Sequence, residues 1–262
     1  MRVERVLCPN PGPYTGPGTN TYVIADDGMA LILDPGPIID SHLEAIRHAL
    51  GSDSPVAVAV THTHPDHAPA ANPLGSEFGV PVYGFAPGLQ FEPTDTVADG
   101  DVVRIGSTEL TVLHTPGHTD DHICYLGEDV LFTGDHIISG STVILEDASA
   151  YMDSLETVEK VTPELILPGH GERITDGRSA VAAYIAHRRM REDQFVSAIA
   201  SGATTVGDIV DIVYEGLASA LVPAAMHQVG VVLLKLAKDG RIAAWDGDVL
   251  AATRLTVGTE RA

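Results

Sequence analysis

His62-Thr63-His64-Pro65-Asp66-His67 is the most informative part of this sequence. It places three imidazoles and one carboxylate directly after the apolar run 56–61. Such a run is typical of a buried strand, and the carboxyl ends of strands are where sites gather in layered α/β folds. Imidazole and carboxylate groups together suit zinc and neighbouring first-row metal ions. The run therefore predicts a metal site at the end of a strand.

Three later positions share this context. Each follows a short apolar run and stands beside a glycine, which lets the backbone turn sharply and approach an ion closely. They are His118 after residues 109–113, Asp135 after residues 129–132, and His170 after residues 164–167. We expect these strand ends to meet the histidine-rich run at one site.

With these motifs the chain resembles the metallo-β-lactamase-fold hydrolases over nearly its whole length. Within that superfamily it is most similar to lactamase-β-like-2 (endoribonuclease-like) proteins, on the motifs at residues 115–122, 142–147, 151–155 and 187–192. The resemblance implies an α/β fold, the αββα four-layer sandwich, and two divalent metal ions. The implied ligands are His62, His64 and His118 for the first ion, Asp66, His67 and His170 for the second, and Asp135 as the bridge.

The chemistry expected of such a site is hydrolysis by a hydroxide shared between two metal ions, which lower the pKa of a bound water to roughly 7. Zinc is the first expectation, and iron or manganese suits the same ligands. Asp66 is a candidate catalytic residue because it can also accept a hydrogen bond from the nucleophile. His122 is a second candidate, as a proton donor or substrate contact, and a supporting or surface role is the alternative. Asp120 and Asp121 could orient His118 or cap a turn.

The pattern of apolar residues predicts strands mixed with helices and no repeats, which favours two packed sheets flanked by helices. The glycine- and proline-rich residues 68–95 are expected to be irregular apart from one short strand. The expected strands are two within 20–34 around a turn at 26–28, then 56–61, 80–83, 102–105, 109–113, 123–126, 130–132 and 165–167. The expected helices are 39–50 and 151–160.

The C-terminal part changes character. Residues 179–200, 206–214 and 224–239 have helical patterns, and residues 240–245 are expected to form a short strand. We predict a metal hydrolase domain over residues 1–177 and a small helical, winged-helix-like domain over residues 178–262. The last helix has only Lys235 and Lys238 as permanent cations. For this helix we favour packing or dimerisation, as in a homodimer, over contact with nucleic acid.

Composition limits the remaining possibilities. The chain has 262 residues, 44% of them hydrophobic, and no apolar run that approaches the length of a membrane span. Without a signal or transit peptide and with only Cys8 and Cys124, we expect a cytoplasmic protein that does not contact membranes. Residues 1–176 carry 6 Lys/Arg and 27 Asp/Glu, a net of −21, whereas residues 177–262 are neutral. This acidity disfavours long polyanions as ligands.

Two substrate classes stay open. The resemblance favours single-stranded RNA slightly, with the arginines at 178, 188, 189 and 191 as the only clustered contacts. The acidity favours a small ester, thioester or lactone, as in a glyoxalase II-like enzyme. His67 and Asp135 differ from the residues that lactam-hydrolysing relatives often carry, so at most weak β-lactamase activity is expected. A non-catalytic metal-binding regulator is the alternative of another class.

Overall fold

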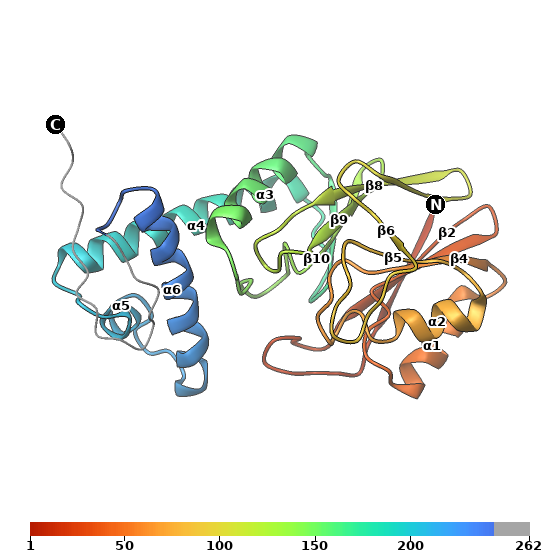
Figure 1. The fold of residues 1–262 in the computed structure, drawn as a ribbon, viewed down its shortest axis with the longest axis horizontal. Coiled ribbons are helices and arrows are strands. Elements are labelled where there is room, and N and C mark those ends of the chain that lie inside the picture. Colours follow the sequence, from red (N-terminus) through yellow and green to blue (C-terminus); the bar gives the residue numbers. More distant parts are fainter. Residues whose placement is uncertain (244–262) are drawn as a thin grey trace.

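Two mixed β-sheets packed face to face form the centre of the protein. The structure is a computed structural model and describes residues 1–243 (Figure 1). One sheet has six strands in the order β1-β2-β3-β4-β5-β6 and the other has five in the order β11-β10-β9-β8-β7. The first contains β1 (Arg2–Leu7), β2 (Asn20–Asp26), β3 (Met29–Leu33), β4 (Ser54–Ala59), β5 (Val82–Gly84) and β6 (Asp95–Thr96). The second contains β7 (Val102–Ile105), β8 (Thr108–His114), β9 (Ile123–Leu126), β10 (Val130–Gly134) and β11 (Leu165–Pro168).

The inner faces of the sheets share one apolar core. Ile24 and Leu31 of the first sheet and Tyr125 and Phe132 of the second are fully buried in it. Alternation along β2 and β3 sends their other side chains outward, where Val23 and Ile32 pack under helices. Each sheet is therefore apolar on both faces, which requires a further layer on each outer side.

Helices supply these outer layers. α1 (Asp40–Leu50) and α2 (Ala71–Phe78) cover the first sheet, and α3 (Ala148–Val161) covers the second. The side chain of Asp147 begins α3 by accepting hydrogen bonds from the backbone N–H groups of Ser149 and Ala150. The predicted αββα order of layers is confirmed.

Three elements of the sandwich differ from the sequence-based expectation: α2, β1 and the two-residue strand β6. α2 lies inside residues 68–95, which were expected to be irregular, and β1 was not expected at all. Pro73 stands in the first turn of α2, where no intrahelical N–H is needed, and a Cβ at Gly75 would lie 2.2 Å from a Val82 methyl. Glycine thus lets this helix approach β5 closely. β1 is a mostly exposed edge strand, so it has little apolar pattern.

The C-terminal helices extend from the sandwich as a separate lobe (Figure 1). α4 (Gly177–Ala200) packs beside α3 and continues into this lobe. The lobe also holds α5 (Val206–Val213), a short 3-10 turn (Ser219–Leu221) and α6 (Val222–Lys238). Of the strand expected at 240–245, Ile242 forms a β-bridge, the other residues of 240–243 form a turn and bends, and the rest lies outside the described residues. The division at residue 177 stays a prediction.

One expectation about hydropathy is wrong. Residues Ser219–Lys238 form a helical stretch of 20 residues with mean hydropathy 1.6, long and apolar enough by those two criteria to cross a membrane. In the structure, Val229, Leu233 and Leu236 on this stretch are buried in the core that α6 shares with α4 and α5. A helix packed in a protein core meets the same criteria, so this finding is weak support for membrane contact.

Candidate metal centre

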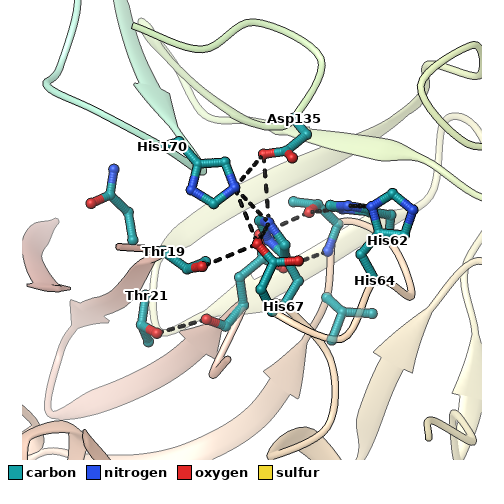
Figure 2. A network of polar contacts seen from close by, with 12 residues as sticks. Thr19, Thr21, His62, His64, His67, Asp135 and His170 are labelled. Atoms are coloured by element: carbon teal, nitrogen blue, oxygen red, sulfur yellow. Dashed lines mark hydrogen bonds and ion pairs between the residues drawn. The ribbon is translucent and has the colours of Figure 1, made fainter. Parts of the chain in front are cut away.

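The histidine-rich run lies in the loop that follows β4. Its first turn closes by hydrogen bonds from the backbone N–H groups of His67 and Ala68 to the carbonyl of His64. The turn directs His62, His64, Asp66 and His67 toward the edge where β8, β10 and β11 also end. The four segments predicted to meet do meet there, and Figure 2 shows three of them, with His62, Asp135 and His170.

Three histidines form the first group of converging atoms. Nε2 of His62 lies 3.0 Å from Nδ1 of His64, and Nε2 of His118 lies 3.1 Å from that same atom. Two nitrogens bound to one tetrahedral zinc at about 2.1 Å are themselves about 3.4 Å apart. These spacings therefore fit three ligands of a single ion.

Asp66, His67 and His170 form the second group. Nε2 of His170 lies 3.2 Å from Oδ2 of Asp66 and 3.4 Å from Nε2 of His67. Nε2 of His67 lies 3.4 Å from the same Asp66 oxygen. The group combines two imidazoles with one carboxylate, a donor set that suits zinc, iron or manganese.

Asp135 stands between the two groups. Its Oδ1 lies 3.2 Å from Nε2 of His170 and 3.5 Å from Nε2 of His67, whereas its Oδ2 lies 3.6 Å from Nε2 of His118. Oδ1 is buried and has no hydrogen-bond partner among the described residues. A buried carboxylate oxygen without a donor is costly, and a cation at this point would satisfy it. The residues present therefore fit a metal pair.

The ring nitrogens that face away from the centre are also engaged. Nδ1 of His67 lies 2.9 Å from Oδ2 of Asp34, and Nδ1 of His62 lies 3.1 Å from Oγ1 of Thr61. Nδ1 of His118 donates to the carbonyl of Ile144 at 2.6 Å, and Nδ1 of His170 lies 3.3 Å from the carbonyl of Gly18. These contacts fix the tautomer and orientation of the four rings, as is usual for histidines that bind metals. The sequence analysis did not predict these four contacts.

The two groups differ in charge. Burial, followed by the neighbouring imidazoles, lowers the pKa of His62 well below its usual value, so this ring is neutral and able to bind a metal. Burial lowers the pKa of His170, but the adjacent carboxylates of Asp135 and Asp66, each 3.2 Å from its Nε2, outweigh burial and raise this pKa to about 9. Burial would raise the pKa of Asp135, yet His67 and His170 hold it well below its usual value. The second group is thus an imidazole–carboxylate cluster, whereas burial lowers the pKa of both His62 and His64 in the first group and favours their neutral rings.

His122 is brought close to the centre but lies behind Asp135. It is fully buried, and its Nε2 accepts a hydrogen bond from the backbone N–H of Asp135 at 3.2 Å. Its Nδ1 therefore carries the proton and donates to Oγ1 of Thr115 at 2.9 Å. Both nitrogens are engaged, which favours support of the Asp135 loop over proton donation or substrate contact. A catalytic role of His122 stays a prediction.

Two sets of supporting residues were missed from the sequence. Asp34 is buried and accepts hydrogen bonds from the backbone N–H and Oγ1 of Thr61 at 2.7 and 2.8 Å, in addition to facing His67. Thr19 donates to Oδ2 of Asp66 at 3.2 Å and is itself held by Asn10. The signal for Asp34 was an acid directly after the apolar strand β3 and before a Pro-Gly pair. Asp120 is exposed, and the ring of His118 is held by Ile144 instead.

Comparisons with known proteins agree with the sequence motifs and with the fold. Residues 14–170 match the family model described as metallo-beta-lactamase superfamily, and residues 205–248 match the beta-lactamase associated winged helix domain. A beta-lactamase-like protein 2 homolog from Caenorhabditis elegans is 33% identical over 250 residues, which cover 91% of this chain and 85% of that protein. An atrochrysone carboxyl ACP thioesterase from Aspergillus chevalieri is 30% identical, over 92% of this chain and 83% of that protein. A solved beta-lactamase domain protein from Burkholderia ambifaria has the same fold, with a TM-score of 0.82 at 23% identity over 97% of this chain and 91% of that chain.

Proposed function

The chain belongs to the metallo-β-lactamase superfamily and carries the associated winged-helix domain, as its motifs predict, and we propose that it is a binuclear hydrolase. Its membership of the family and its similarity to relatives named as thioesterases make the protein a metal-dependent hydrolase. The binuclear proposal is carried by one observation. The two oxygens of Asp135 face different ligand groups, one toward His67 and His170 and the other toward His118.

Seven residues would hold the metal pair: His62, His64 and His118 on one side, Asp66, His67 and His170 on the other, and Asp135 between them. Two bound divalent ions, zinc first among them, would supply a water acidic enough to ionise near neutral pH and a strong field for a carbonyl oxygen. The remaining work is done by the chain. Asp66, whose side chain is 26% exposed, is the ligand-group carboxylate most open to a substrate, and it can take up a proton or orient a water. Thr19 holds its Oδ2 from the other side.

For the substrate we propose a small acyl compound, a thioester before an ester or lactone. One support is the thioesterase name of the fungal relatives. The other concerns the arginines expected to contact RNA. Arg188 donates to the carbonyl of Val143 and Arg191 to Gln194, and each guanidinium stacks on a tyrosine. Arg189 lies 3.3 Å from Glu156. With these three arginines engaged inside the protein or paired, little positive charge in the cluster remains for a polyanion.

Single-stranded RNA is the second candidate. It is favoured by the winged-helix module and by relatives named beta-lactamase-like protein 2 homologs, from Caenorhabditis elegans and Drosophila melanogaster. Arg178 is exposed and forms no salt bridge within residues 1–243, so it is the contact to examine first.

The deciding experiment is a hydrolysis panel with protein reconstituted separately with zinc, iron and manganese. The panel contains a short-chain acyl thioester, an ester, a lactone, a chromogenic β-lactam and a single-stranded RNA oligonucleotide. We expect turnover of the thioester at a kcat/KM at least tenfold above that of the lactam, and loss of turnover on chelation. RNA cleavage without thioester hydrolysis would overturn the acyl proposal, and no hydrolysis of any substrate would overturn the enzymatic one.

A further inference from the structure

Three consecutive backbone carbonyls, those of Val143, Ile144 and Leu145, accept hydrogen bonds from three different parts of the protein. We call residues 143–145 the connecting segment. The carbonyl of Ile144 accepts from the candidate metal ligand His118 at 2.6 Å. The other two accept from the C-terminal helices.

Arg188 of α4 makes the first of these C-terminal contacts. Its Nη2 donates to the carbonyl of Val143 at 2.8 Å, while its guanidinium carbon lies 4.9 Å above the ring of Tyr151 on α3. The stacked tyrosine restricts the direction of the planar guanidinium. Arg188 is half-buried, so its hydrogen bond is partly shielded from competing water.

The second contact comes from α6. Nε2 of His227 lies 3.1 Å from the carbonyl of Leu145, and Nε2 of Gln228 donates to the same oxygen at 3.2 Å. The side chain of Leu145 is buried in the core that contains Val229 and Leu233 of α6. Both ends of the connecting segment are therefore fixed by residues of the C-terminal part.

The segment also returns directly to the turn that carries His118. The backbone N–H groups of Glu146 and Asp147 donate to the carbonyl of Gly117 at 2.8 and 3.1 Å. His118 is thus held on two sides by one short stretch of chain, through its ring at Ile144 and through the preceding peptide at Gly117. A shift of this stretch would move the ring and its Nε2 together.

His118 differs in this from the other histidines of the centre. Among the described residues, the outward nitrogens of His62, His67 and His170 contact Thr61, Asp34 and Gly18, which all belong to the sandwich. Only the support of His118 runs on to the C-terminal helices within residues 1–243.

We propose that Arg188, with the pair His227 and Gln228, is a positioning element that holds the ring of His118 through the connecting segment. The C-terminal helical part is then a structural support of the first metal group. This rests on the proposed function, since it assigns His118 to a metal. It adds that the affinity of one of the two ions depends on residues that contact neither ion.

The test uses the full chain with Arg188→Met, which keeps the aliphatic stem and removes the donors, and separately with His227→Ala/Gln228→Ala. Arg189→Met is the matched control, because Arg189 is the next residue on α4 and is exposed. Affinities for both zinc equivalents are measured by competition with a chromophoric chelator. Exchange of the His118 Nδ1 proton with solvent is followed by NMR in metal-free protein, and Arg188→Lys serves as rescue.

We expect each variant to weaken one of the two equivalents by about tenfold, the low end for groups that support a metal ligand, and to leave the other within twofold. The His118 proton should exchange at least fivefold faster, Arg188→Lys should recover at least half of the lost affinity, and Arg189→Met should match the wild type. Unchanged affinities and unchanged exchange in folded variants would overturn the proposal. If the wild type binds fewer than two equivalents of zinc, the proposal of a binuclear centre is wrong. The positioning role is then tested by the exchange rate of the His118 Nδ1 proton in metal-free protein alone. If Arg188→Met does not fold, the α6 double variant carries the same test.

Discussion

The carboxylate of Asp34 lies 2.9 Å from Nδ1 of His67, opposite the Nε2 atom that faces Asp66 and Asp135. Asp34 adopts a left-handed backbone with φ of 51°, which turns its side chain back toward the end of β4. There it also accepts two hydrogen bonds from Thr61. One carboxylate thus fixes both the start of the histidine-rich loop and one of its ligand rings.

Replacing Asp34→Asn should weaken the metal centre without abolishing the fold. The amide NH₂ that replaces one carboxylate oxygen is a hydrogen-bond donor, and it would face another donor, on Thr61 or His67. One of the hydrogen bonds that Asp34 accepts would therefore be lost. We expect metal affinity to fall by about 10–100-fold and the metal-free protein to lose about 1–3 kcal/mol of unfolding free energy. Chelator competition and urea unfolding in EDTA measure these effects. Asp27→Asn is the control, since Asp27 is also left-handed but lies in an exposed turn; an equal loss there would mean that the effect is one of backbone conformation.

The number of bound metal ions is directly measurable. Elemental analysis of reconstituted wild-type protein should give about two equivalents per chain, because seven candidate ligands exceed the four that one tetrahedral ion uses. His118→Ala and His170→Ala should each lower the value to about one, from different sides of Asp135. Saturation of the wild type at one equivalent would contradict the binuclear proposal.

Asp66→Ala should collapse turnover while the protein stays folded. The substitution removes the most exposed carboxylate among the candidate ligands, whose Oδ2 lies within 3.4 Å of Nε2 of both His67 and His170. A fall in kcat of about 100-fold or more is expected for a group with acid–base and ligand roles. Circular dichroism and thermal melting check the fold, and Asp120→Ala is a matched control on the exposed loop beside His118. Turnover within threefold of wild type would show that Asp66 has no such role.

Acid sensitivity should decrease when His136 is removed. This ring is fully buried, neither nitrogen has a partner among the described residues, and burial lowers its pKa to about 3. The unfolded chain, with a histidine pKa near about 6.5, binds the proton more readily, so stability is lost as the pH falls from about 6.5 toward 3.

We therefore expect His136→Leu to be neutral or stabilising at pH 7 and to gain further on the wild type at pH 5, by up to about 1.4 kcal/mol per pH unit. Urea unfolding in EDTA at both pH values measures the difference. A constant difference between wild type and variant across this range would show that His136 is not the titrating group.

The two substrate classes respond differently to surface charge. Arg178 and Arg189 are exposed, so Arg178→Ala/Arg189→Ala removes positive charge without disturbing Arg188 or Arg191. Thioester hydrolysis should stay within twofold of the wild type, since that substrate needs only the metal pocket. If RNA is cleaved, its cleavage should weaken at least threefold, and its salt dependence should become less steep. RNA cleavage that ignores both the substitutions and salt would refute the electrostatic reasoning.

Most of the fold could be predicted from the apolar pattern. The hairpin of β2 and β3, the buried strand β4 and the long helix α4 all have patterns that suit a single structure. α2 could not be found in this way, because it contains Pro73 and Gly75, which are weak helix formers. The structure accommodates Pro73 in the first turn of the helix, and it requires glycine at position 75 because Val82 lies close by. β1 forms because β2 offers it a partner, which is a property of the sheet and not of the segment.

The converging ligands were predictable because each stands in a short motif at a strand end. Their supports were not, because contacts such as Ile144 with His118 or Gly18 with His170 use backbone carbonyls, which have no sequence signature. The apolar length of residues Ser219–Lys238 was also underestimated. The contacts of the arginine cluster were unpredictable for a related reason, since sequence spacing on α4 does not reveal that Arg188 and Arg191 stack on Tyr151 and Tyr214.

α4 has a consequence for how this architecture can be inherited. It begins beside the sandwich, packs on α3 and continues into the C-terminal lobe, so that Leu155 of α3, Phe195 of α4 and Leu233 of α6 share one apolar core. The two parts are therefore joined by a helix that packs on α3 at one end and on α5 and α6 at the other, and not by an open linker. Exchange of the winged-helix module between enzymes, by recombination or by engineering, would have to bring the matching surface of α4 with it, or leave the apolar side of α3 exposed to aggregation.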